Sequence, residues 1–112
     1  MISRRLPLLS HIDLSYNQLE SIEGITHLTS LRILKLNNNT ISTLSDISTL
    51  PQLEILNVSD NHVKVLPNML HLGMLKVLKA NNNEITVLHP SIVSLKMLEE
   101  ISMNDNQVCN HI

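Results

Sequence analysis

The residues of this chain that could bind a metal ion lie near its C-terminus. Asp105, Cys109 and His111 offer a carboxylate, a thiol and an imidazole within a short segment. Structural zinc sites normally take four ligands in paired spacings, and this segment supplies three in an unpaired one. The sequence therefore predicts no metal site and no cofactor.

Three neighbouring side chains have the types needed for nucleophilic catalysis. Ser10, His11 and Asp13 could supply a hydroxyl, a base and an acid, but alternation along a strand sends consecutive side chains to opposite faces. An enzyme needs such groups to converge in a pocket that excludes water. A glycine-rich phosphate loop is also excluded, because Gly24 and Gly73 are the only glycines. We therefore expect no catalytic residues and no enzymatic activity.

A repeated pattern determines where these and the other side chains lie. The stretch from Leu53 to Val63 reads L-x-x-L-x-L-x-x-N-x-L, with Val allowed in place of Leu. The pattern starts at five positions, Leu9, Leu31, Leu53, Leu75 and Leu98. The spacing is 22 residues three times and then 23. A fixed period of this length indicates a repeat array.

Each repeat is expected to contain one short strand and a return limb. A strand this short cannot bury its apolar face alone, so stacking on the next repeat completes both the ladder and the core. Apolar residues spaced by three, such as Ile22, Ile25 and Leu28, favour helical or 3₁₀ turns in the limb. Pro90, near the extra residue of the fourth repeat, is expected to begin a short helix.

By its length the chain is one domain. The repeats divide it into residues 9–30, 31–52, 53–74, 75–97 and 98–112, and the fifth of these is incomplete. Residues 1–8 have the form of a remnant of a preceding repeat or of an N-terminal cap.

Every pattern ends in an asparagine that comes just before an inward residue. The amide offers donors and an acceptor, so it can satisfy backbone groups that a turn leaves unpaired. We therefore predict a buried structural ladder, and no ligand site, at five positions: Asn17, Asn39, Asn61, Asn83 and Asn106.

These residues resemble leucine-rich repeats over nearly the whole chain, from Leu6 to Val108. The first repeat, in its stretch from Ile12 to Ile25, is especially similar to the 22-residue class of a nuclear regulatory subunit of protein phosphatase-1. The third and fourth repeats look more like the typical intracellular class. The resemblance implies an α/β fold, a right-handed solenoid of strands and 3₁₀ or helical turns with a short parallel sheet on its concave face. It also implies partners such as a phosphatase catalytic subunit, a ciliary dynein motor domain or a spliceosomal protein.

Composition argues against other classes of partner. Eight basic and ten acidic residues give a net charge of −2, and no basic stripe could follow a phosphate backbone. One Tyr without Phe or Trp leaves nucleic-acid bases little to stack on. The sequence has no apolar run long enough for a signal peptide or a membrane span. We expect no direct nucleic-acid partner, no membrane contact and a cytoplasmic location, with nuclear or ciliary compartments as alternatives.

Stacking should align equivalent side chains in columns on the concave face. One column contains His11, Ile33, Ile55, Val77 and Glu100, and a parallel one contains Asp13, Lys35, Asn57, Lys79 and Ser102. Three adjacent aliphatic residues beside lysines are typical of a protein-binding surface, although β-branched residues also favour strands for their own sake. The predicted partner-binding residues are His11, Asp13, Tyr16, Ile33, Lys35, Ile55, Asn57, Val77, Lys79 and Glu100.

Two functions follow as hypotheses. The first is a non-catalytic module that binds a partner protein through its concave face. The second is a structural assembly segment, or a fragment of a larger leucine-rich-repeat protein, whose uncapped ends stack on other subunits.

The fourth repeat is expected to be underpacked. Ala80 stands where the other repeats have larger inward residues. A flexible methionine could fill the space, and the candidates are Met74, Met97 and Met103.

Overall fold

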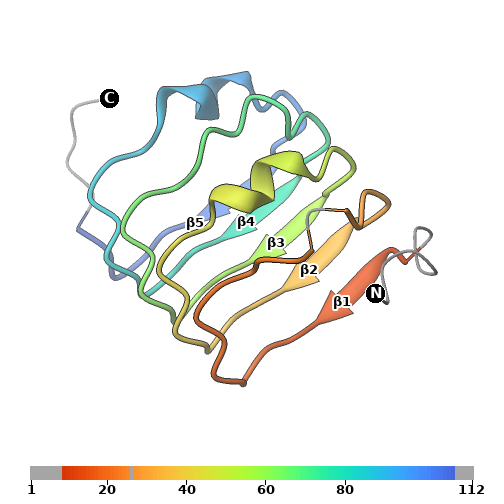
Figure 1. Ribbon diagram of the computed structural model, residues 1–112. Helices are drawn as coiled ribbons and strands as arrows, with labels where there is room; N and C mark the ends of the chain where they lie inside the picture. The colour runs from red at the N-terminus through yellow and green to blue at the C-terminus, as the bar shows by residue number, and fades with distance from the viewer. Residues whose placement is uncertain (1–8, 26, 108–112) are drawn as a thin grey trace.

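The structure is a computed structural model that describes residues 9–25 and 27–107. Within them the chain coils so that each turn contributes one strand, and a return limb joins each strand to the next (Figure 1). The strands are β1 (His11–Asp13), β2 (Ile33–Lys35), β3 (Ile55–Asn57), β4 (Val77–Lys79) and β5 (Glu100–Ser102). They form one parallel sheet in the order β1-β2-β3-β4-β5. The predicted fold class, a repeat solenoid with a short parallel sheet, is confirmed.

The strand register places equivalent residues of successive repeats side by side. Ile55 is paired with Ile33 of β2 and with Val77 of β4. The pairing continues to His11 at one end of the sheet and to Glu100 at the other. Because Val77 and Glu100 are 23 residues apart, the extra residue of the fourth repeat lies in its return limb and leaves the register of the sheet unchanged.

The core lies between the sheet and the return limbs. Leu34 and Leu78 from the strands are fully buried, and so are Ile47 and Leu72 from the limbs. No helix in the described part of the chain is long and apolar enough to cross a membrane. We call the opposite face of the sheet, which points away from this core, the concave face.

The burial of the three candidate methionines can be compared with the expectation that one of them fills the space beside Ala80. Ala80 is fully buried, and Met103 packs against the same core. Met74 and Met97 are 44% and 43% exposed, so they do not fill the space beside Ala80. Of the three candidates, Met103 is the one that packs against the core.

In the described part of the chain, two return limbs contain 3₁₀ helices, η2 (Ser45–Thr49) and η3 (Pro90–Ser94). The limb residues Leu44, Ile47 and Leu50 are buried, and their backbones form bonds of the same spacing, as from the Ile47 N–H to the Leu44 carbonyl at 3.0 Å. Pro90 begins η3, as predicted. The side chain of His89 caps this helix, because its Nδ1 accepts a hydrogen bond from the Ser91 N–H at 3.0 Å.

Beyond each strand the chain turns through one residue in the left-handed conformation. These residues are Tyr16, Asn38, Asp60, Asn82 and Asp105, with φ between 55° and 61°. Asn and Asp adopt this conformation more readily than other residues with a side chain, which explains four of the five. Tyr16 is the exception, and its ring is 75% exposed.

Candidate functional site: the concave face and its columns

The asparagine side chains join each turn to the next. Asn61 Nδ2 donates to the carbonyls of Val58 in its own turn and of Leu36 in the preceding turn, both at 3.0 Å. Its Oδ1 accepts from the Ile41 N–H at 3.0 Å. Equivalent bonds between consecutive turns are made by Asn39, Asn83 and Asn106. These side chains serve the fold and leave little hydrogen-bonding capacity for a ligand.

The prediction that all five asparagines are buried is wrong at the two ends of the ladder. Asn39, Asn61 and Asn83 are buried, but Asn17 is exposed and Asn106 is half-buried. Both of these lie in the outermost turns of the described sheet, which have a described neighbouring turn on one side only. Burial of the amide therefore depends on stacking from both sides.

The aliphatic strip predicted on the concave face is present as a column. Ile33, Ile55 and Val77 stand side by side in the register of the sheet, and each is half-buried. His11 and Glu100 continue the column at its two ends and are exposed. These five candidate residues are therefore brought together in one line.

The second column contains Asp13, Lys35, Asn57 and Lys79, side by side in register. The remaining candidate, Tyr16, lies in the turn beyond β1 and so stands at the rim. Whether these residues contact a partner stays a prediction.

The charged side chains of the second column differ in whether they already have a bonding partner within the chain. The Asp13 carboxylate accepts from the Ser15 hydroxyl at 2.6 Å and from the Ser15 N–H at 3.0 Å. These bonds lower the pKa of Asp13, and the positive charge of Lys35 adds a smaller effect in the same direction. Lys79 forms no ion pair with any described residue. It is therefore available to an incoming negative charge.

A column of ion pairs runs beside the strip and was not among the predicted site residues. Arg32 Nε lies 2.8 Å from Glu54 Oε2, and Lys76 Nζ lies 3.7 Å from Glu54 Oε1. The hydrogen bond from Arg32 is the largest cause that lowers the pKa of Glu54, and the same bond raises the pKa of Arg32. The sequence did carry a signal for it, since the second pattern position reads Ser10, Arg32, Glu54, Lys76 and Glu99.

A further polar column lies nearer the turns. Asn81 Oδ1 accepts from the Ser102 hydroxyl and from the Asn104 N–H, both at 2.8 Å. The Ser59 hydroxyl in turn accepts from the Asn81 N–H at 3.0 Å. These bonds fix the side chains across three turns, so this edge of the concave face is preorganised.

The groups considered for chemistry are not brought together. Asp13 is hydrogen-bonded to Ser15, and His11 and Asp13 occupy different columns of the open face. Within residues 9–25 and 27–107, no three His, Cys, Asp or Glu side chains are arranged to hold a metal ion. Cys109 and His111 lie outside the described residues. A hollow of about 360 Å³ at the turns holds one exposed pair, His62 Nδ1 and Glu84 Oε2, at 3.2 Å.

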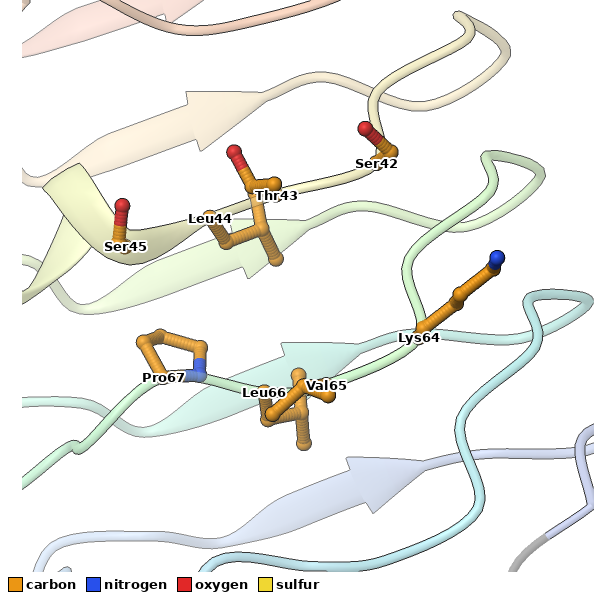
Figure 2. Close-up of a pocket in the computed structure, with 8 residues that line it drawn as sticks. All are labelled: Ser42, Thr43, Leu44, Ser45, Lys64, Val65, Leu66 and Pro67. Carbon is orange, nitrogen blue, oxygen red and sulfur yellow. The ribbon is translucent and has the colours of Figure 1, made fainter.

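A second hollow lies between two return limbs, away from the concave face. It has a volume of about 430 Å³ and is lined by residues 42–45 and 64–67. Figure 2 shows these two segments running alongside each other in front of the strands. Val65 is 68% exposed there, while Leu44 and Leu66 are buried. The hollow is a shallow groove between successive turns.

Comparisons with known proteins agree with the repeat pattern and with the solenoid fold. Residues 7–50 match the family described as leucine-rich repeats in two copies. Internalin C2 from Listeria monocytogenes superposes with a TM-score of 0.87 at 28% identity, over 95% of this chain and 46% of that one. A leucine-rich-repeat protein from Leptospira interrogans gives 0.86 at 27% identity, over 94% of this chain and 33% of that one. Residues 7–50 therefore match leucine-rich repeats in sequence, and the described chain has the same solenoid fold as these leucine-rich-repeat structures.

A third structure, an internalin (inlF) from Listeria monocytogenes, superposes with a TM-score of 0.87 at 25% identity. The superposition covers 96% of this chain and 31% of that one, so this chain spans less than half the length of each of the three. No curated protein sequence matches the chain. Leucine-rich-repeat domains generally mediate interactions between proteins. The comparisons neither extend the resemblance to the phosphatase regulator nor favour an assembly segment with stacked ends.

Proposed function

We propose that this protein is a non-catalytic module that binds a partner protein through the concave face of its sheet. The observation that carries the proposal is the column of Ile33, Ile55 and Val77, because three aliphatic side chains lie in line on the face that the core does not cover. The columns on either side are polar or charged. An apolar strip with a charged rim is the usual anatomy of a protein-binding surface.

The energetic scale suits a moderate interaction. Burying one such side chain contributes at most about 1.5–3 kcal/mol. Three of them contribute several kcal/mol, from which the costs of association and of ordering side chains are subtracted. The rim charges add orientation and speed of encounter more than affinity.

Capture of a partner by wild-type protein and by Ile55→Glu and Val77→Glu variants tests the proposal. A carboxylate in the strip should weaken binding about tenfold or more, because it removes apolar contact and leaves a charge without a partner. Bound proteins are identified by mass spectrometry, and the affinity of each is then measured with purified components.

The matched control is Val93→Glu, because Val93 is 80% exposed in η3 on a return limb. This variant should bind as wild type does. Unfolding temperatures of all variants are measured alongside, and those of the strip variants should change little. If a partner stays bound to Ile55→Glu and Val77→Glu, or is lost from Val93→Glu instead, the binding surface lies elsewhere.

A further inference from the structure

The spacing of the three aliphatic side chains indicates which backbone conformation of a partner segment fits them. Neighbouring parallel strands lie about 4.8 Å apart, so the column from Ile33 to Val77 spans about 10 Å. A helix rises 1.5 Å per residue, so its residues i, i+3 or i+4, and i+7 form one stripe about 10.5 Å long. An extended segment places residues i, i+2 and i+4 on one side over about 13 Å. A helix that runs across the strands can therefore meet all three side chains, whereas an extended segment would overshoot them.

Cations stand on both sides of the strip. Lys35 and Lys79 are two residues further along the strands than Ile33 and Val77, which is about 7 Å. On the other side, Arg32 precedes Ile33 in the chain as Lys76 precedes Val77. A helix with its side chains is about 10–12 Å across, so the flanks of a helix on the strip would face these cations.

The sign of the charge in this region differs from that of the whole chain. In the columns beside the strip, the three central turns carry four cations, Arg32, Lys35, Lys76 and Lys79, and one acid, Glu54. Their sum is +4 − 1 = +3, although the chain as a whole carries −2. The acid is already bonded to Arg32, and no described acid pairs with Lys79. The centre of the concave face is therefore complementary to carboxylates.

Resting on the proposed function, we infer that the partner presents an amphipathic α-helix whose aliphatic stripe is flanked by carboxylates. The aliphatic side chains pack on Ile33, Ile55 and Val77. Acidic residues seven positions apart on one flank, about 10.5 Å along the helix, meet Lys35 and Lys79, which stand about 10 Å apart. The inference also fixes the orientation of the partner, because its helix must run across the strands to meet all three aliphatic side chains.

Three synthetic peptides of about 18 residues, long enough to form some helix in water, test this inference. The first carries Leu at helical spacing with Glu on both flanks of the stripe. The second replaces each Glu by Lys. The third keeps the composition of the first but alternates Leu with polar residues, which suits an extended strand. Binding to the full chain is measured by fluorescence anisotropy at low and high salt.

The helical Glu peptide should bind at least about tenfold more tightly than the Lys peptide at low salt, because several exposed charge pairs change sign together. The difference should shrink at high salt. A Lys35→Glu, Lys79→Glu double variant should reverse the preference. Its circular dichroism spectrum and unfolding temperature serve as the control for folding.

Equal binding of the two helical peptides, tighter binding of the alternating peptide, or no binding of any peptide would overturn the inference. The result is separable from that of the proposed function. If the peptides fail while Ile55→Glu still releases a captured partner, the concave face binds proteins but not an acidic helix. If Ile55→Glu retains every captured partner, the proposed function itself falls.

Discussion

At the scale of single residues, one amide per turn holds the solenoid together. Asn61 bonds to Leu36 in the preceding turn and to Val58 in its own, and its oxygen receives the Ile41 N–H. The buried Ile41 N–H would lose its partner without this amide, whereas the carbonyls of Leu36 and Val58 also accept from the amides of neighbouring turns. A buried polar group without a partner costs about 1–3 kcal/mol.

Asn61→Ala should therefore lower the free energy of unfolding by about 1–3 kcal/mol, since it leaves the buried Ile41 N–H unpaired. Asn17→Ala is the matched control, because the same amide is exposed at the end of the ladder. Its cost should be less than half as large. Urea unfolding of both variants measures the difference, and equal losses would show that burial of the amide does not matter.

Much of this residue-level structure could be predicted from the sequence. Asparagine recurs directly before an inward residue, and that position calls for a side chain with both donors and an acceptor. The burial of each amide could not be predicted in the same way, because it depends on how many turns stack around it. The left-handed residue before each amide could be predicted in four repeats, because it is an Asn or Asp there: Asn38, Asp60, Asn82 and Asp105. In the first repeat the residue is Tyr16, a type that does not indicate this conformation.

At the scale of structural elements, the charged column beside the strip links three successive turns. Arg32, Glu54 and Lys76 are each 22 residues apart, and the stack brings them within ion-pair distance. Reading opposite charges at one repeat interval would have revealed it. The sequence could not predict which return limbs form a 3₁₀ helix. Apolar spacing by three also occurs in limbs that form none, such as residues 66–72.

Glu54→Gln should destabilise the protein at neutral pH and have no effect in acid. The pKa of Glu54 is held below its ordinary value of 4.5, chiefly by the hydrogen bond from Arg32. A lowered pKa in the folded state stabilises the fold above the ordinary value, and this stabilisation is lost as the pH falls through the lowered pKa. Urea unfolding at about pH 7 and about pH 2 compares the variant with wild type.

The control for that experiment is Glu20→Gln, an exposed acid outside the column that forms no ion pair with any described residue. Its effect should be close to zero at both pH values. A penalty for Glu54→Gln that persists unchanged in acid would mean that the carboxylate stabilises the column by packing and not by charge.

Ala80→Val should be neutral or stabilising, within about 1 kcal/mol, because the other described turns carry larger residues at this position and Met103, which packs against the same core, is flexible enough to make room. Val58→Ala is the converse change at the equivalent fully buried position of the preceding turn. It should cost about 1.5–3 kcal/mol. Thermal unfolding compares the two, and a large loss for Ala80→Val would show that the site is already full.

At the scale of the whole molecule, stability is shared between turns through contacts with immediate neighbours. The inward residue of β3, Leu56, is 3% exposed, whereas the equivalent residue of β5, Ile101, is 41% exposed. Both occupy the same position in the pattern, so the sequence alone does not distinguish them. The difference follows their places in the sheet, because β3 lies between β2 and β4 whereas β5 pairs with β4 at the end of the strand order.

Leu56→Ala should cost about 2–5 kcal/mol, because it leaves a cavity between two packed turns. Ile101→Ala removes a side chain that is partly in water already and should cost less than about 1.5 kcal/mol. Amide hydrogen exchange should show the same gradient, with slower exchange in β3 than in β5. Similar costs at the two positions would indicate that the end of the sheet is covered in solution.

The extra residue of the fourth repeat has a consequence for how such a surface can change. The additional length is absorbed at the outside, in the limb that holds η3, while Val77 and Glu100 remain neighbours in the sheet. The position of a side chain on the concave face is thus set by two things only, the turn to which it belongs and its place in the strand. An insertion in a return limb, such as this one, changes neither of them. A combinatorial library that varies the concave-face residues of the strands would therefore change the binding surface and keep the scaffold.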